Sequence, residues 1–310
     1  MASKDDAIHS NAAPFIYTLG QVRVRQDVAF RNYQGEEKSG IRSRAEKAIE
    51  KLQQPLSKFL EPDEAVFYVA RCQAPASAFE QMAFGWYTYR VTAALLVFTN
   101  RRILHFVVKA DGTWKESIRS ANWGDLEMVQ VKGWLSPVLE LTCRDGKKQK
   151  YWGVRRDDSK VIKLLAQVLL LGSKSEMTSA QQMTQLCPQC KAALSPGIYR
   201  CNECRLVFKD EATLVKRSLL IPGGGYFYTG NVFLGIGDAI AEVYLLLLTL
   251  VWVPIALGVV VEPVEPGEEP FTAAAAWILV VFFGGLLAIE KWATIHHCRR
   301  FIREYIPIKN

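Results

Sequence analysis

Histidine is scarce in this chain, and its scarcity limits the catalytic chemistry that the sequence supports. Only His9, His105, His296 and His297 occur among 310 residues. No serine, cysteine or aspartate beside any of them suggests a catalytic triad, and no pair of carboxylates falls in a recognisable cleft loop. We therefore expect a protein that is not an enzyme and that has no small-molecule substrate.

A glycine-rich stretch lacks the residues that a phosphate-binding loop needs. Residues 221–231 read IPGGGYFYTGN. A Walker loop carries a lysine followed by serine or threonine after its last glycine, and a dinucleotide-binding loop lies between a strand and a soluble helix. Neither pattern is present here, so nucleotide binding is not expected.

The N-terminus lacks an apolar segment, whereas the C-terminal third of the chain has two. Residues 1–11 contain no h-region, so no cleavable signal is expected. Residues 243–261 and 271–289 are runs of nineteen residues without charge, each about 28 Å long as a helix and close to the thickness of the hydrocarbon core. Two such runs predict a transmembrane helical hairpin within residues 219–299; the alternative is a pair of buried core helices.

The charges beside these runs predict an orientation. Residues 262–270 carry four acids and no lysine or arginine, whereas Lys216 and Arg217 precede the first run and Lys291 follows the second. Basic residues are retained on the cytoplasmic side. We expect a multi-pass protein of the cytoplasmic membrane with both termini in the cytoplasm and a basic tail over residues 300–310.

The glycine-rich stretch is typical of a turn that leads into a membrane. A proline ends any preceding helix, and aromatic rings suit the boundary between water and lipid. The pattern P-G-x-G-x-x-Y-x-G resembles the signature of a small family with two transmembrane helices, and the resemblance covers residues 219–299. It implies membrane residence and no defined chemistry. The residues that carry it are Pro222, Gly223, Gly225, Tyr228 and Gly230.

Four polar residues lie close to the apolar runs. Asp238 and Glu242 are four residues apart on one helix face, and His296 and His297 follow the second run at a similar depth. Acids near a bilayer suggest a proton or metal site. The alternative, which we favour from the sequence, is that both groups are hydrated at the interface.

Four of the seven cysteines form two C-x-x-C motifs, Cys187 with Cys190 and, ten residues later, Cys201 with Cys204. This spacing lets four thiolates surround one ion tetrahedrally, and four sulfur ligands favour zinc over iron. Disulfides, the alternative, rarely persist in the cytosol. Residues 187–210 resemble the short zinc ribbons of many prokaryotic proteins. We predict a structural Zn²⁺ site that serves as a spacer and does not bind nucleic acid.

Short β-rich runs alternate with turns over residues 61–171. Seven strands are expected, followed by a helix whose apolar residues repeat at intervals of three and four. Seven strands closed by one C-terminal helix is the order of a pleckstrin-homology barrel. The phrase LVFTNRRILH at residues 96–105 resembles a hairpin of bacterial pleckstrin-homology-like and GRAM-like domains. The resemblance implies a seven-stranded β-barrel that binds partners and has no catalytic residues.

The remaining segments complete a multidomain α+β membrane protein. Residues 1–40 are predicted to be largely disordered or extended. Residues 41–60 have helical spacing and form an amphipathic helix that Pro55 breaks or kinks. Residues 172–186 are small and polar, which is typical of a linker.

Two surfaces of the predicted barrel are candidates for binding. The loop at residues 73–89 is nearly uncharged and rich in aromatics, which either pack on the barrel or form an exposed patch. Basic residues gather further on, where they either form a solvated strand pair or face the anionic inner leaflet, at about 1 kcal/mol for each residue. They are Arg144, Lys147, Lys148, Lys150, Arg155 and Arg156.

These observations predict an adaptor anchored in the lipid bilayer, whose cytoplasmic domain binds a protein or an anionic lipid at the inner face of the membrane. The alternative is an auxiliary subunit of an integral-membrane complex, such as a transporter or a secretion system. Its helices would associate through small residues such as Gly258, Gly284 and Gly285.

Overall fold

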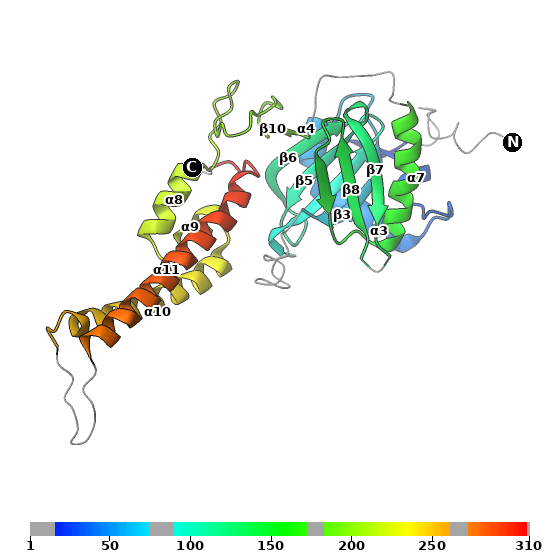
Figure 1. Ribbon diagram of the computed structural model, residues 1–310. Coiled ribbons are helices and arrows are strands. Elements are labelled where there is room, and N and C mark those ends of the chain that lie inside the picture. Colours follow the sequence, from blue (N-terminus) through cyan, green and yellow to red (C-terminus); the bar gives the residue numbers. More distant parts are fainter. Residues whose placement is uncertain (1–15, 75–89, 135, 173–182, 261–271, 309–310) are drawn as a thin grey trace. The chain divides into compact units, whose positions relative to one another are not determined.

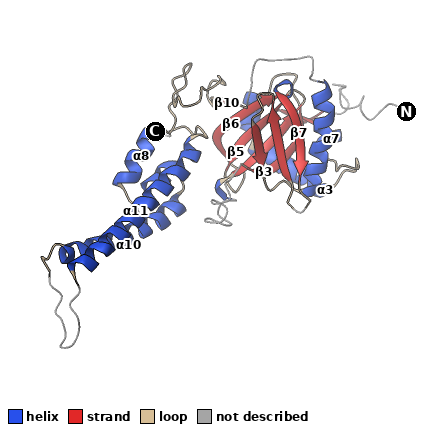
Figure 2. Ribbon diagram, viewed as in Figure 1, coloured by secondary structure: helices blue, strands red, loops and turns tan. Residues whose placement is uncertain are grey.

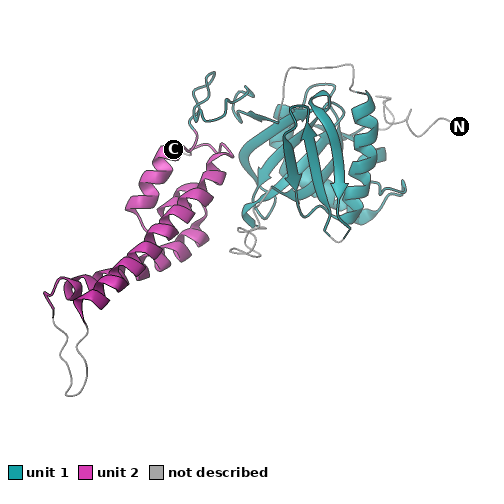
Figure 3. Cartoon of the chain, in the orientation of Figure 1, with its two compact units in different colours: residues 1–207 teal, residues 208–310 magenta. Residues whose placement is uncertain are grey.

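The chain divides into two compact units, Met1–Val207 and Phe208–Asn310, shown in Figure 3. The computed structural model describes residues 16–74, 90–134, 136–172, 183–260 and 272–308. Within these residues the first unit combines strands and helices, and the second contains helices only (Figure 2). The fold is therefore α+β.

The first unit begins with two short strands and three helices and continues with the seven strands that the sequence predicts (Figure 1). Its elements are β1 (Ile16–Leu19), β2 (Val22–Arg25), α2 (Gln26–Ala29), α3 (Ser39–Lys51), α4 (Gln53–Phe59), β3 (Val66–Gln73), β4 (Ala93–Thr99), β5 (Arg102–Val108), β6 (Trp114–Asn122), the 3₁₀ turn η2 (Trp123–Asp125), β7 (Leu126–Lys132), β8 (Val138–Cys143), β9 (Lys148–Tyr151), α7 (Arg156–Gly172) and β10 (Thr184–Leu186).

The strands form two separate sheets. The larger has the order β1-β2-β3-β4-β5-β6-β10, and the smaller has the order β7-β8-β9. From β3 to β6 each strand pairs antiparallel with the next, and Leu96 faces His105 across the β4–β5 hairpin. Strands β3 to β9 and nearly all of α7 lie within residues 61–171, where seven strands and a helix are predicted.

The expected closure into a barrel is not seen. Closure would require strands of the second sheet to pair with the free edges of β3 and β6. Strand β10 occupies the edge of β6, and β2 pairs with the edge of β3 at one position, Val24 with Val66. At the other end of β3, Gln73 exchanges two backbone hydrogen bonds with Trp152, which follows β9, but this isolated bridge does not extend into a ladder. The turn η2 also separates β6 from β7. The paired edge of β6 has no backbone groups left for a further partner.

Both faces of the larger sheet are covered. One hydrophobic cluster joins α3 and α4 to one face through residues such as Ile49 and Val97. The other joins the smaller sheet and α7 to the opposite face through residues such as Leu96 and Ile162. Strand β4 is buried at every position, which explains its continuous apolar sequence.

The predicted amphipathic helix over residues 41–60 is two helices. A proline ring collides with the carbonyl group four residues earlier in a helix, which for Pro55 belongs to Lys51, and α3 ends at Lys51. Pro55 itself lies in the first turn of α4, where its missing N–H group is not needed.

The T-N-R-R phrase ties the β4–β5 hairpin to the segment that precedes β3. Thr99 Oγ1 donates a hydrogen bond of 2.7 Å to Glu64, and Asn100 Oδ1 accepts one of 2.9 Å from the backbone N–H of Ala65. Arg102 also donates to the Glu64 carboxylate. In this chain the phrase is therefore structural.

The second unit consists of α8 (Glu211–Leu220), α9 (Gly224–Thr229), α10 (Val232–Ala256) and α11 (Ala273–Ile302). Helices α10 and α11 are long and apolar enough to cross a membrane, and they run side by side in Figure 1. In the most apolar 18-residue stretch of each helix, only 11% of α10 and 6% of α11 is buried. This exposure disfavours a pair of buried core helices.

Several predicted segments differ in extent from the elements. Residues 16–29, within the segment expected to be disordered or extended, form β1, β2 and α2. Strand β10 lies in the expected linker, and α11 continues into the expected tail. Other predicted segments lie outside the described residues. They include residues 1–15, residues 75–89, which make up most of the aromatic loop, and residues 261–271, which include the acidic loop.

Candidate functional site

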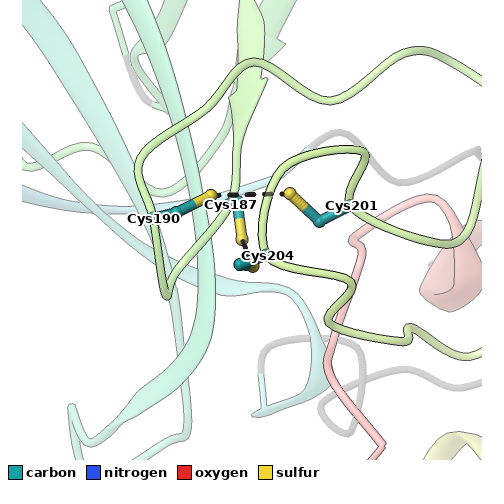
Figure 4. Close-up of side chains that lie close together, drawn as sticks. All are labelled: Cys187, Cys190, Cys201 and Cys204. Carbon is teal, nitrogen blue, oxygen red and sulfur yellow. Dashed lines mark hydrogen bonds between the residues drawn. The ribbon is translucent and has the colours of Figure 1, made fainter.

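The four C-x-x-C cysteines converge on one point, as Figure 4 shows. Their sulfur atoms all lie within 4.8 Å of one another. The Cys187 and Cys204 sulfurs are 3.5 Å apart, as are those of Cys190 and Cys201. A tetrahedral ion with bonds of about 2.3 Å separates its sulfur ligands by about 3.8 Å. The cluster therefore has the dimensions of a metal site.

Two similar backbone turns present these sulfurs. In the first, the N–H of Lys191 bonds to the carbonyl of Cys187 at 3.0 Å; in the second, the N–H of Arg205 bonds to the carbonyl of Cys201 at 3.1 Å. Lys191 and Arg205 both have positive φ, at 67° and 65°. In each turn this residue, in the left-handed conformation, reverses the direction of the chain after the cysteine pair.

The local environment shifts the pKa values of two cysteines of the cluster in opposite directions. Burial raises the pKa of Cys187 to about 12. Burial acts in the same direction on Cys201, but the backbone N–H groups of Cys204 and Glu203 outweigh it and lower the pKa of Cys201 to about 7. A bound metal ion replaces thiol protons, because only thiolates act as ligands.

A basic groove of about 300 Å³ lies where α3 crosses β3, beside the β5–β6 turn and the start of α7. Five basic residues and two acids are among its lining residues: Arg44, Lys47, Lys51, Arg71, Arg155, Asp111 and Asp158. The positive charge therefore exceeds the negative charge there.

The two acids of the groove are already engaged. Asp158 Oδ1 accepts a 2.9 Å hydrogen bond from the hydroxyl of Tyr68. Burial raises the pKa of Asp158, and this hydrogen bond opposes the rise. Asp111 accepts from Thr113, at both its backbone N–H and its hydroxyl. Asp158 therefore links α7 to β3, whereas Asp111 bonds within its own turn. The five basic side chains of the groove are exposed.

The six basic residues proposed from the sequence lie on three elements. Arg144 and Lys147 are in the β8–β9 turn, where Arg144 donates to the carbonyl of Gly124 and Lys147 pairs with Asp145. Lys148 and Lys150 are both exposed on β9. The remaining two lie at the start of α7. Arg155 lines the basic groove, and the guanidinium of Arg156 lies over the ring of Trp134.

The glycine-rich stretch forms the turn between α8 and α10. Helix α8 ends before Pro222, and Gly223 has φ of +67° where α9 begins. Gly230, with φ of +87°, ends α9, and the hydroxyl of Tyr228 accepts a 3.0 Å hydrogen bond from the N–H of Asp210. Gly225 is buried within α9.

Asp238 and Glu242 do meet α11, but not through the two histidines. They lie beside Glu290, and the ammonium of Lys291 lies 2.7 Å from Glu242. His297 Nδ1 is 2.8 Å from the hydroxyl of Tyr226, and His296 stacks on Trp292.

The sequence reasoning missed Glu290 and Lys291 as site residues, and of the charged residues of the basic groove it named only Arg155 as a site residue. A signal for the first two was present, because both follow the second apolar run at the depth where Glu242 precedes the first. The groove combines residues from 44 to 158, and no periodicity relates them.

Comparisons with known proteins assign no family. No protein family and no curated protein matches this sequence. One solved structure, the C-terminal domain of an unknown protein from Leishmania infantum, covers 42% of this chain and 98% of its own length. Its identity is 10% and its TM-score is 0.25, so this similarity does not establish a shared fold.

Proposed function

We propose that the chain is a membrane-anchored adaptor whose N-terminal unit binds an anionic lipid surface through the basic groove. The observation that carries the proposal is the excess of positive charge in the groove. Among the described residues, the side chains of Arg44, Lys47 and Arg155 make no hydrogen bond or ion pair. Each basic residue near an anionic leaflet contributes about 1 kcal/mol. The exposed Lys148 and Lys150 add to the attraction where they face the same surface.

Two further features support this reading. The order of four consecutive strands, three consecutive strands and a closing helix is that of a pleckstrin-homology domain, a binding scaffold; this support is an analogy of fold. The apolar helices α10 and α11 supply the anchor, with both termini proposed to be cytoplasmic. In the same proposal the four thiolates hold structural zinc, which sulfur-only ligands favour, and the ribbon serves as a spacer.

Hydrogen exchange of the full chain in lipid nanodiscs tests the proposal. We expect α3 to exchange more slowly in discs that contain phosphatidylglycerol than in discs of phosphatidylcholine alone. The double variant Lys47→Glu with Arg44→Glu removes this difference, whereas Lys163→Glu, an exposed charge reversal on α7, retains it. Equal exchange in both lipids overturns lipid binding. If added cytosolic protein then protects α3, the adaptor binds an acidic protein instead.

The alternative, an auxiliary subunit of a membrane complex, has its own support. A side chain added at Gly285 would meet nothing within 4 Å, whereas Gly284 faces Thr249 of α10. The open space at Gly285 would let a helix of another protein pack closely against α11. Crosslinking from Gly285→Cys in intact membranes discriminates the two functions, because the subunit gives a heterologous adduct and the adaptor gives none.

A further inference from the structure

Three acidic side chains come together at one end of the α10–α11 pair. Asp238 and Glu242 lie one turn apart on α10, and Glu290 lies on α11. One carboxylate oxygen from each lies within 4.8 Å of the other two. The carboxylates adjoin the apolar runs, at the end of the hairpin nearer to α8 and α9.

Each carboxylate has one oxygen in a hydrogen bond and one oxygen without a partner. Asp238 Oδ1 and Glu290 Oε1 lie 2.8 and 3.0 Å from the hydroxyl of Thr294. Glu242 Oε2 accepts from the N–H of Gly223 at 3.0 Å and from Lys291 at 2.7 Å. Asp238 Oδ2, Glu242 Oε1 and Glu290 Oε2 are buried, and no N–H or O–H donor of the described residues bonds to them.

The unpartnered oxygens need an electropositive partner, which is either a proton or a cation. Glu242 is only 2% exposed, so water does not solvate its bare oxygen. The hydroxyl of Thr294 carries a single proton and satisfies only one of its two neighbours at a time. A buried carboxylate without a partner is costly, and three of them at this separation also repel one another.

The balance of charge identifies the ligand. Three carboxylates and the ammonium of Lys291 leave two negative charges, which one divalent cation neutralises. All the donors are oxygen atoms, which hard ions such as Mg²⁺, Mn²⁺ and Ca²⁺ prefer to the softer metals that thiolates select. Two ligands of one Ca²⁺ at about 2.4 Å are at most about 4.8 Å apart, and the three acids meet this limit.

We propose that Asp238, Glu242 and Glu290 bind one hard divalent cation, with Lys291 as a fixed internal countercharge. The ion joins α10 to α11. Through the hydrogen bond from Gly223 to Glu242 it also stabilises the turn between α8 and α9. The site is separate from the thiolate cluster and takes a different class of metal.

Titration with Mn²⁺ followed by electron paramagnetic resonance tests the proposal. The full chain is reconstituted in phosphatidylcholine nanodiscs after loading with Zn²⁺, so that the thiolates are occupied. We expect one Mn²⁺ for each chain, displaced by Mg²⁺ or Ca²⁺. Asp238→Asn and Glu290→Gln, which keep a carbonyl oxygen beside Thr294, weaken binding at least tenfold. Glu211→Gln, which removes an acid of the same unit outside the cluster, leaves binding unchanged.

Melting temperatures keep the test decisive if a variant folds poorly. Mn²⁺ raises the melting temperature of the wild-type chain and of Glu211→Gln, but not that of Glu290→Gln. Absence of saturable Mn²⁺ binding to the wild type overturns the proposal. So does a Glu290→Gln variant that is more stable than the wild type in every metal concentration, because the cluster then holds protons only. Neither result depends on lipid binding by the basic groove.

Discussion

Arg102 holds the buried carboxylate of Glu64 through two hydrogen bonds. Its Nε donates to Oε1 at 2.9 Å, and its Nη2 donates to Oε2 at 2.7 Å. The side chain of Glu64 is 0% exposed and that of Arg102 is 15% exposed. The paired geometry joins the β4–β5 hairpin to the chain before β3 and leaves no bare charge in the core.

Replacing Arg102 by methionine is expected to destabilise the first unit by about 3–5 kcal/mol, because Glu64 then remains buried without its countercharge. Urea unfolding of the full chain in detergent, followed by tryptophan fluorescence, measures the loss. The neighbouring Arg101 is a matched control. It is 46% exposed and pairs with Glu61 and Asp63 at the surface, so Arg101→Met costs less than about 1 kcal/mol. Equal losses would contradict the structural role of the buried pair.

The sequence predicts the strands of the first unit because their signals are local. Strand β4 is a continuous apolar run. The turn Asp111-Gly112 connects β5 to β6, and the turn Asp145-Gly146 connects β8 to β9. The apolar spacing that places Val161 and Leu165 on one face of α7 is likewise visible without a structure. These elements need no information from distant parts of the chain.

The open sheet arrangement is not visible in the sequence for the opposite reason. Strands β1 and β2 have four residues each and β10 has three, too few for a periodic pattern. Nevertheless β10 pairs along the edge of β6, and β2 pairs with β3 at one position, Val24 with Val66. Which edge a short strand joins depends on tertiary packing, and the local sequence does not encode it.

The two candidate metal sites differ in the same way. The four cysteines form two motifs with diagnostic spacing, so their cluster is predicted from the sequence and confirmed. Asp238 and Glu290 are 52 positions apart, as their residue numbers show. Their meeting depends on the register of α10 against α11, which small differences in packing decide.

Removal of one thiolate is expected to release the metal of the ribbon. Cys187→Ser lowers bound zinc from one ion for each chain to almost none and loosens residues 187–207, because the segment is too short to bury a core of its own. Atomic absorption of the purified chain measures the content. Cys72→Ala is the control, since Cys72 is a buried thiol on β3 outside the cluster. Unchanged zinc in Cys187→Ser would refute the site.

Acid is expected to destabilise the first unit through His105. This residue is 2% exposed, and neither ring nitrogen has a hydrogen-bond partner in the part of the chain that the structure describes. Burial, together with the nearby charge of Arg119, lowers the pKa of His105 to about 3, against about 6.5 in an unfolded chain. Between these values the unfolded chain binds a proton that the folded chain does not. The stability that neutral His105 contributes is therefore present above about pH 6.5 and declines as the pH falls toward 3.

His105→Phe removes the group that binds this proton in the unfolded chain. It keeps an aromatic ring against Tyr151, whose ring centroid lies 5.3 Å from that of His105 in an edge-on contact. We expect the urea midpoint of the variant to change less between pH 7 and pH 5 than that of the wild type. This window lies above the ordinary pKa values of the carboxylates. The same pH dependence in both proteins would show that the pKa of His105 does not differ between the folded and the unfolded chain.

The turn between α8 and α9 is expected to tolerate no side chain at Gly223. This residue has φ of +67°, and a Cβ atom there would overlap the carbonyl oxygen of Gly235. Gly223→Ala therefore combines left-handed strain with overpacking, at a cost above about 2 kcal/mol, and also displaces the N–H group that bonds to Glu242. In detergent we expect the melting temperature to fall by at least about 4 °C.

Gly237 provides the matched comparison, because it lies in α10 and a Cβ there would meet nothing within 4 Å. Alanine has a higher helix propensity than glycine by about 1 kcal/mol, so Gly237→Ala leaves the melting temperature unchanged or raises it. Circular dichroism of both variants in the same detergent measures the two temperatures. If Gly223→Ala has the same melting temperature as Gly237→Ala, the turn can rearrange without a loss of stability. Its contact with Glu242 then does not stabilise the hairpin.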